Sequence, residues 1–315
     1  MFVSDQKVAF VAPVAAPTWK RWLLYSSIAR LAIFIGLFVP GVIGITHAMH
    51  ALGWVHTAPP LQAGLGQMVG RIAPALTAYL LLTYFVERRR PVELLSRNAF
   101  SRALAGLVIG TLLFSAVVGM LWLLGSYHVV GFNPHANWIT ALMMVGLGAG
   151  IGEEIMFRGA LFRILEEDFG SWVALIVSAL FFGVAHISNP GATLWSSLAI
   201  AVEAGLLFGL LYMVTRSLPI CMGLHAAWNF CQGTVYGIPV SGTTADGWLV
   251  STRTGPDWLT GGAFGAEASV IALLTCVLLS LVLLTIALKR GCVVSPAWMR
   301  RRQSVASLSG APAVT

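Results

Sequence analysis

A series of long apolar stretches is the feature that most constrains the fold of this chain. A helix of about 18 apolar residues, rising about 1.5 Å per residue, crosses roughly 30 Å of hydrocarbon. Of the 315 residues, 57% are hydrophobic and only 10% are charged, whereas a soluble domain carries about 25% charged residues. The pattern predicts an all-α, polytopic transmembrane bundle of about eight helices, at 22–46, 69–86, 102–126, 138–157, 171–187, 194–215, 219–236 and 268–288.

Positive charge is distributed unevenly among the expected loops. With an even number of spans, one side of the membrane keeps only Arg71 and Arg253. Because basic loops stay in the cytoplasm, this asymmetry predicts a multi-pass cell-membrane protein with both termini cytoplasmic. Topology explains the net charge of +7, so we expect a lipid bilayer and no nucleic acid as partner. The cytoplasmic set is Lys7, Lys20, Arg21, Arg88, Arg89, Arg90, Arg97, Arg102, Arg158, Arg163, Arg216, Lys289, Arg290, Arg300, Arg301 and Arg302.

The stretch 138–157 carries four alternating glycines ahead of an acidic pair. Small residues let helices approach closely in lipid, where few other forces hold them together. We therefore expect this helix to lie inside the bundle. The glycines are Gly146, Gly148, Gly150 and Gly152.

The acidic pair Glu153-Glu154 precedes Arg158 in a membrane segment, where each charge costs about 2.5–3.5 kcal/mol. Glu154 and Arg158 are four residues apart and share a helix face, so they are expected to pair. Glu153 then points about 100° away and is free to act on a water. In the alternative interpretation both glutamates are solvated at the cytoplasmic boundary, and Arg158 is an ordinary cation at a helix end.

Two further polar groups lie in apolar helices. His186 ends an apolar stretch, and His225 and Asn229 share one face of another at spacing four. Side chains of these types can stabilise an oxyanion or bind a metal. The alternatives are an interfacial or hydrogen-bonded His186 and a simple helix-to-helix hydrogen bond from the other two.

The three motifs, Glu153-Glu154-x-x-x-Arg158, Phe182-x-x-x-His186 and His225-x-x-x-Asn229, resemble those of the CAAX-protease and bacteriocin-processing family of intramembrane peptidases. The resemblance covers about 140 to 235, in the family's order, on successive apolar helices. It implies a helical core in which a glutamate and a histidine activate water for attack on a peptide bond.

Carried over by position, the resemblance implies a role for each residue. Glu153 is the general base and His186 its partner; His225 and Asn229 stabilise the oxyanion; Glu154 and Arg158 form the supporting pair. No cofactor is required by this glutamate-type mechanism, which we favour. The alternative is a zinc site of Glu153, His186 and His225, since three nitrogen or oxygen ligands plus water suit catalytic zinc.

Simple alternation of spans places Glu153 near the cytoplasmic end of its helix and His186 near the outer end of the next. A shared site then requires that 158–170 re-enter the bundle, or that the helix before His186 be short, tilted or broken near Asn189-Pro190. Glu203, in the following helix, is expected to line the same cavity or polarise His186, or else to be a hydrogen-bonded structural acid.

These features divide the chain into five regions. They are a cytoplasmic N-terminal tail (1–21), N-terminal transmembrane helices (22–136), a catalytic helical core with the three motifs (137–236), an outer loop and last transmembrane helix (237–290) and a disordered cytoplasmic tail (291–315).

Three functions are compatible with these features. The favoured one is an endopeptidase acting on a membrane-associated or lipidated peptide or membrane protein, prenylated substrates being implied by the resemblance alone. The alternatives are a non-catalytic membrane binding or immunity protein of the same fold, and a proton-coupled transporter. The lack of an internal repeat disfavours the transporter.

Overall fold

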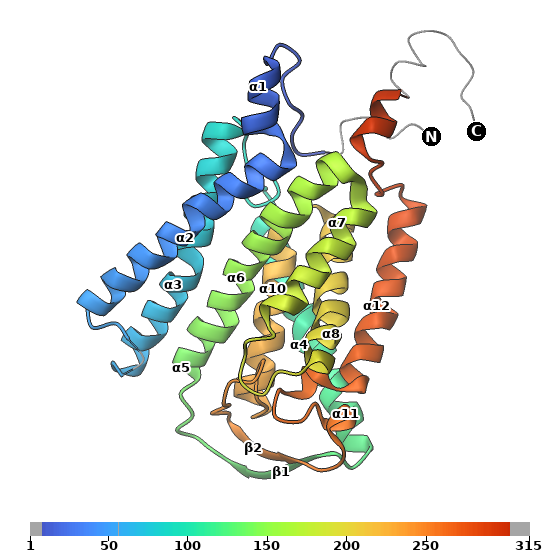
Figure 1. Ribbon diagram of the computed structural model, residues 1–315. Coiled ribbons are helices and arrows are strands. Elements are labelled where there is room, and N and C mark those ends of the chain that lie inside the picture. Colours follow the sequence, from blue (N-terminus) through green and yellow to red (C-terminus); the bar gives the residue numbers. More distant parts are fainter. Residues whose placement is uncertain (1–7, 56, 303–315) are drawn as a thin grey trace.

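The computed structural model describes residues 8–55 and 57–302, and it is a helical bundle (Figure 1). The parts of the predicted tails at 1–7 and 303–315 lie outside the described residues. Within the described ranges, six helical segments are long and apolar enough to cross a membrane. The protein is therefore a multi-pass membrane protein. The six segments are Ser27–Ala51, Pro60–Val86, Ala99–Leu123, Trp138–Ala185, Leu194–Thr215 and Val270–Lys289.

The six segments account for seven of the eight stretches expected from the sequence. The expected helices 138–157 and 171–187 lie in one segment, which folds back on itself at Gly170. The expected helix 219–236 forms as well, but its polar residues, including His225 and Asn229, make it less apolar than the six. The predicted fold class is confirmed.

The first half of the chain contributes the outer helices and the start of the central helix, which begins at Trp138 and carries Glu153 and Glu154. Short π-helical stretches interrupt or end several α-helices and are marked η. In chain order the elements are α1 (Thr18–Lys20), η2 (Arg21–Tyr25), α2 (Ser27–Ala51), α3 (Pro60–Leu81), η3 (Leu82–Val86), α4 (Ala99–Leu123), β1 (Tyr127–Phe132), α5 (Trp138–Ala141), η4 (Leu142–Gly148) and α6 (Ala149–Glu154).

The second half completes the core and returns to the starting side. Here η8 is a 3-10 turn rather than a π-helix. The elements are η5 (Ile155–Phe162), α7 (Arg163–Ala185), α8 (Leu194–Ile200), η6 (Ala201–Leu206), α9 (Leu207–Thr215), α10 (Leu218–Phe230), η7 (Cys231–Val235), β2 (Leu249–Arg253), α11 (Asp257–Thr260), η8 (Ala266–Ala268) and α12 (Val270–Lys289).

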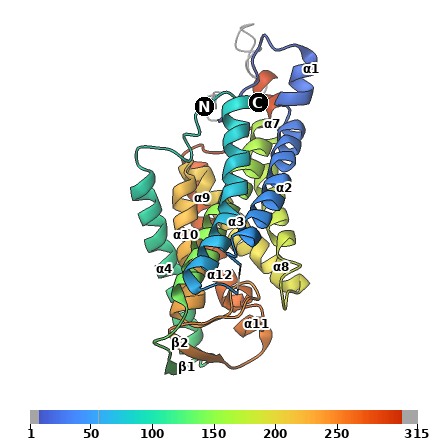
Figure 2. The same cartoon turned by 90° about the vertical axis from the view of Figure 1, so that its left-hand side faces the viewer.

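Glycines bring the central helix into close contact with both of its neighbours. A Cβ at Gly150 would lie 2.8 Å from the backbone nitrogen of Ala226 in α10, and one at Gly152 would lie 2.8 Å from the carbonyl oxygen of Arg71 in α3. Any side chain there would push these helices apart. The predicted interior position of this helix is confirmed, and α4 stands beside α10 on the side away from α2 (Figure 2).

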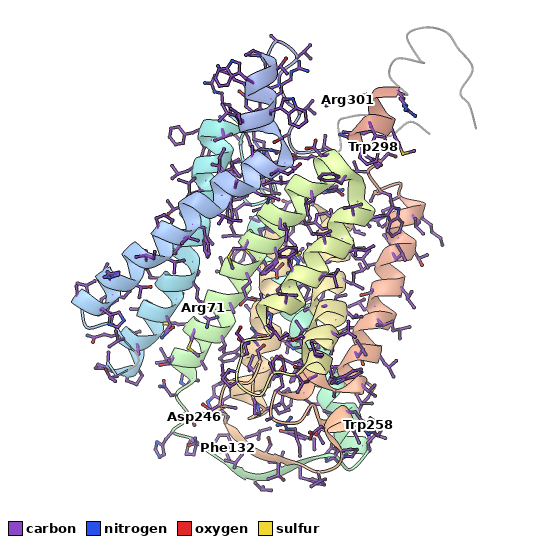
Figure 3. All side chains as sticks on the ribbon, in the orientation of Figure 1. Arg71, Phe132, Asp246, Trp258, Trp298 and Arg301 are labelled. Carbon is purple, nitrogen blue, oxygen red and sulfur yellow. The ribbon has the colours of Figure 1, made fainter. Side chains whose placement is uncertain are left out.

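The two ends of the bundle differ in structure. At one end β1 and β2 form an antiparallel pair, close to the labelled Asp246 and Trp258 (Figure 3). At the other end lie α1 and the labelled Trp298 and Arg301, so the described chain begins and ends on one side.

The tail predicted to be disordered from 291 is ordered as far as residue 302. Val294 accepts a hydrogen bond from the backbone N–H of Ser171 at 3.0 Å, and its own N–H donates to Ser171 Oγ at 2.8 Å. Burial of Val294 against the turn at Gly170 explains the order, which the polar composition of the tail had concealed.

Arg158 and Arg163 were expected among the cytoplasmic loop charges. Instead, both are about 1% exposed inside the bundle. Arg163 pairs with Glu87 at 2.9 Å and with Glu167 at 3.2 Å, and Arg30 of α2 pairs with Glu87 at 3.0 Å. This network holds the folded-back segment against α2.

The network also shifts the titration of Glu87, which follows the Pro60–Val86 segment. Burial raises the pKa of this carboxyl, but Arg163, Arg89 and Arg30 outweigh burial and lower the pKa to about 2.

Candidate functional site

The turn at Gly170 sets the depth of the two motif helices. Gly170 has φ 83° and ψ 169°, a conformation that side-chain-bearing residues avoid. The chain reverses there, so residues about equally far before and after Gly170 reach one level of the bundle. Glu153 lies on the long helix before Gly170, and His186 lies at the end of the short helix after it. Glu153 and His186 reach a similar depth because the first helix continues through 158–169 before the turn. The second helix, which ends at Ala185, is short.

Glu154 is the completely buried acid of the pair. Its Oε1 accepts a hydrogen bond from Arg158 Nη1 at 2.8 Å and lies 2.9 Å from Nδ1 of His225. Arg158 also donates to the carbonyl oxygens of Ala204 at 2.8 Å and Gly205 at 3.2 Å. The expected Glu154–Arg158 pair is present, and the boundary interpretation of Glu154 does not fit a residue that is 0% exposed.

Glu153 faces a different environment from its neighbour. Its side chain is 19% exposed, with Oε1 3.8 Å from Arg71 Nη1 and Oε2 3.9 Å from Nε2 of His225. Both distances exceed that of a hydrogen bond. The buried Oε2 has no hydrogen-bond partner among the described residues. A carboxylate oxygen is therefore left available to an incoming donor.

His186 and Asn229 each use one polar atom to fix their orientation. Nδ1 of His186 lies 2.8 Å from the carbonyl oxygen of Phe182, so it carries the proton, and Nε2 of the neutral ring is an acceptor. Asn229 Nδ2 donates to the carbonyl oxygen of Val145 at 2.9 Å, which leaves its second N–H free of that bond.

A cavity of about 390 Å³ brings these side chains together. Its walls come from α2, α3, the central helix, α10 and the segment after α7, so the three motifs converge on one space. Glu154 and Arg158 lie behind the wall rather than in it. The polar lining includes Arg71, Glu153, His186, Asn189, His225 and Asn229.

The zinc alternative requires Glu153, His186 and His225 to converge on one ion. Within residues 8–55 and 57–302, the structure holds no group of three or more His, Cys, Asp or Glu side chains placed to hold a metal. In this arrangement Nδ1 of His186 is bound to a carbonyl and Nδ1 of His225 to Glu154. These bonds leave Nε2 of each ring as the possible metal ligand, and zinc binding stays a prediction.

Sequence reasoning missed two residues near the site. It counted Arg71 only as an outer-side charge at the start of the expected helix 69–86, yet Arg71 lies on α3 facing the central helix (Figure 3). It did not consider Glu267, which lies with Glu203 in a second chamber adjoining His186 and His225. Glu203 is outside the larger cavity that Glu153 lines. A basic residue in an apolar helix was the signal available for Arg71.

Part of the chain is similar to a known protein family. Residues 135–231 match the family model described as type II CAAX prenyl endopeptidase Rce1-like. This range contains all three motifs together with the turn at Gly170. No curated protein matches the chain. The predicted resemblance is confirmed over these residues: the helical core of the chain is similar to the CAAX-protease family of intramembrane peptidases.

Proposed function

We propose that the protein is an intramembrane endopeptidase in which Glu153 activates a water molecule for attack on a peptide bond. The observation that carries this proposal is the contrast within the acidic pair. Glu154 is 0% exposed and pairs with Arg158 behind the cavity wall, whereas the Glu153 side chain is 19% exposed and lines the cavity. Among the described residues, each carboxylate has one oxygen without a hydrogen-bond partner. A general base needs access to water and a free lone pair.

The first step is addition of water to the scissile carbonyl. Glu153 takes one proton of the water, and Nε2 of His186, an acceptor in the tautomer fixed by Phe182, accepts a hydrogen bond from the other. The water oxygen forms a bond to the carbonyl carbon, and the π electrons of the carbonyl move to its oxygen. The product of this step is a tetrahedral oxyanion with protonated Glu153.

His225 and Asn229 are the groups that stabilise the oxyanion. The second N–H of Asn229 can donate to it directly. The Nδ1 proton of His225 is directed to Glu154, so its Nε2 donates only when the ring is doubly protonated. Glu154, whose Oε1 lies 2.9 Å from Nδ1, holds the ring of His225 in position.

Collapse of the oxyanion completes the reaction. The carbonyl re-forms, the carbon–nitrogen bond breaks, and protonated Glu153 returns its proton to the leaving amine. Glu154 and Arg158 act as positioning residues, because they orient His225 and do not line the cavity.

Both the substrate and the membrane orientation belong to this proposal. Apolar side chains such as Phe38, Met156 and Phe157 share the cavity with the polar set, as suits a membrane-associated or lipidated peptide. A prenyl group is one such lipid. The end of the bundle with residues 8 and 302 carries the basic segments, which favours a cytoplasmic position for both termini.

Cleavage of a quenched-fluorescent peptide library by detergent-purified protein tests the proposal. Glu153→Gln should abolish cleavage with little change in folding, and His225→Ala should reduce it strongly. Asp257→Asn, an acid-to-amide change at an exposed position, is the matched control and should cleave like wild type.

A strong chelator separates the two mechanisms. Cleavage that survives the chelator supports the glutamate mechanism, whereas loss with rescue by zinc establishes the metal alternative. No cleavage of any peptide, prenylated ones included, by folded wild type refutes the proposal and favours the binding or immunity function.

A further inference from the structure

A second chamber lies directly behind the proposed catalytic residues. It is narrow, with a cavity volume of about 30 Å³, and shares His186, His225, Asn229 and Ser241 with the larger cavity. A side chain that projects from a substrate in the larger cavity would enter this chamber past the two histidines.

Glu203 is a buried acid of this chamber without a partner. Its residue is 3% exposed, and Oε2 has no hydrogen-bond partner among the described residues. Protonation would not remove the difficulty, since the resulting O–H also needs an acceptor. Such a group at the wall of a cavity is satisfied by an occupant that donates hydrogen bonds.

Glu267, from η8, brings a second carboxyl to the same chamber. Its Oε1 accepts hydrogen bonds from the backbone N–H of Ser241 at 2.6 Å and from Ser241 Oγ at 2.8 Å. Burial raises the pKa of Glu267 to about 7, although the bonds from Ser241 lower it. Two neighbouring acids in an apolar setting are both ionised only when a cation is near.

The other walls suit the stem and the charge of a cationic side chain. Phe182, Phe208 and Trp228 line the chamber together with Ile200 and Leu207. Apolar walls pack against the methylene groups of such a side chain. Glu203, Glu267 and Ser241 supply oxygen acceptors for the three N–H bonds of a lysine.

We infer that this chamber is a specificity subsite for a lysine side chain of the substrate close to the scissile bond. The inference rests on the proposed peptidase function and adds its substrate class. Neither acid belongs to the three motifs, so the preference is a property of this chain beyond the motif chemistry.

Binding and cleavage of matched peptides test the subsite. The probes are dye-labelled decapeptides in which lysine or the uncharged norleucine is moved through each position. In the Glu153→Gln background, which lacks the proposed base, the best lysine peptide should bind at least about tenfold more tightly than its norleucine partner. Adding Glu203→Gln should reduce that ratio below about threefold, Glu203→Asp should restore part of it, and Asp257→Asn should leave it unchanged.

The outcomes separate the subsite from the peptidase proposal. Equal binding of lysine and norleucine peptides, or a preference that Glu203→Gln leaves intact, overturns the subsite and indicates a chamber that holds water alone. Cleavage by wild type without a lysine preference also overturns the subsite but leaves the peptidase. A Glu203-dependent lysine preference in a protein that cleaves nothing supports the subsite and refutes the peptidase.

Discussion

The two adjacent glutamates should respond very differently to the same substitution. Glu154→Gln removes the charge that neutralises Arg158, and both side chains are at most 1% exposed. Breaking a buried pair costs about 3–5 kcal/mol. The carbonyl oxygens of Ala204 and Gly205 and the rings of Phe182 and Phe208 still contact the guanidinium. We therefore expect a loss of about 2–4 kcal/mol.

Glu153→Gln should cost far less stability. Its nearest cation, Arg71, is 3.8 Å away with a side chain that is 42% exposed, so the pair is worth less than about 1 kcal/mol. Its effect should fall on catalysis instead, by about 10²–10⁴-fold in rate.

Unfolding in detergent, followed by the fluorescence of the 11 tryptophans, measures both losses beside the peptide assay. The double substitution Glu154→Gln with Arg158→Met leaves no unpaired charge and should recover part of the stability. The reasoning is refuted if Glu154→Gln is as stable as wild type, or if the double variant is no more stable than the single one.

Three further substitutions test other parts of the structure. The pKa of Glu87 is lowered from 4.5 to about 2, so its stabilisation is present above the unfolded value and is lost as the pH falls from about 4.5 to 2. Glu87→Gln should cost roughly 3 kcal/mol at neutral pH and flatten that acid loss in unfolding measured across pH; an unchanged acid profile contradicts this. Gly170→Ala places a Cβ 2.8 Å from the carbonyl oxygen of Val294, and should lower stability by about 1–3 kcal/mol and reduce cleavage by displacing His186; wild-type melting and activity would contradict it. Arg71→Gln should lower kcat/KM by less than about tenfold, because its contact with Glu153 is long and partly exposed; a loss as large as that of Glu153→Gln would make Arg71 part of the chemistry.

Local geometry made the division between the glutamates predictable from sequence. Spacing four predicted that Glu154 pairs with Arg158, and the helical rotation of about 100° predicted that Glu153 points elsewhere. Both features appear in the structure. The contact of Glu154 with His225 was not predicted, because it joins residues 71 positions apart.

The shared depth of the motif residues could not be read from hydropathy. The polar run after Phe162 looks like a loop, since Arg163, Glu166 and Glu167 are charged. Its charges are neutralised by distant partners, including Arg30, which lies 137 positions from Glu167. A hydropathy pattern counts each charge as solvated. The expected helix therefore ended at residue 157, whereas the helical segment continues to the turn at Gly170.

In the function proposed above, chemistry and substrate selection come from different parts of this chain. The proposed base, its partner and the oxyanion donors come from residues 135–231, which match the family model. Arg71 comes from α3 and Glu267 from the segment before α12, both outside that range. Glu203 lies inside the range but outside the three motifs. Residues of this kind can change without altering the arrangement of Glu153, His186 and His225, so the motifs predict the reaction while the side chains around them determine which peptide enters.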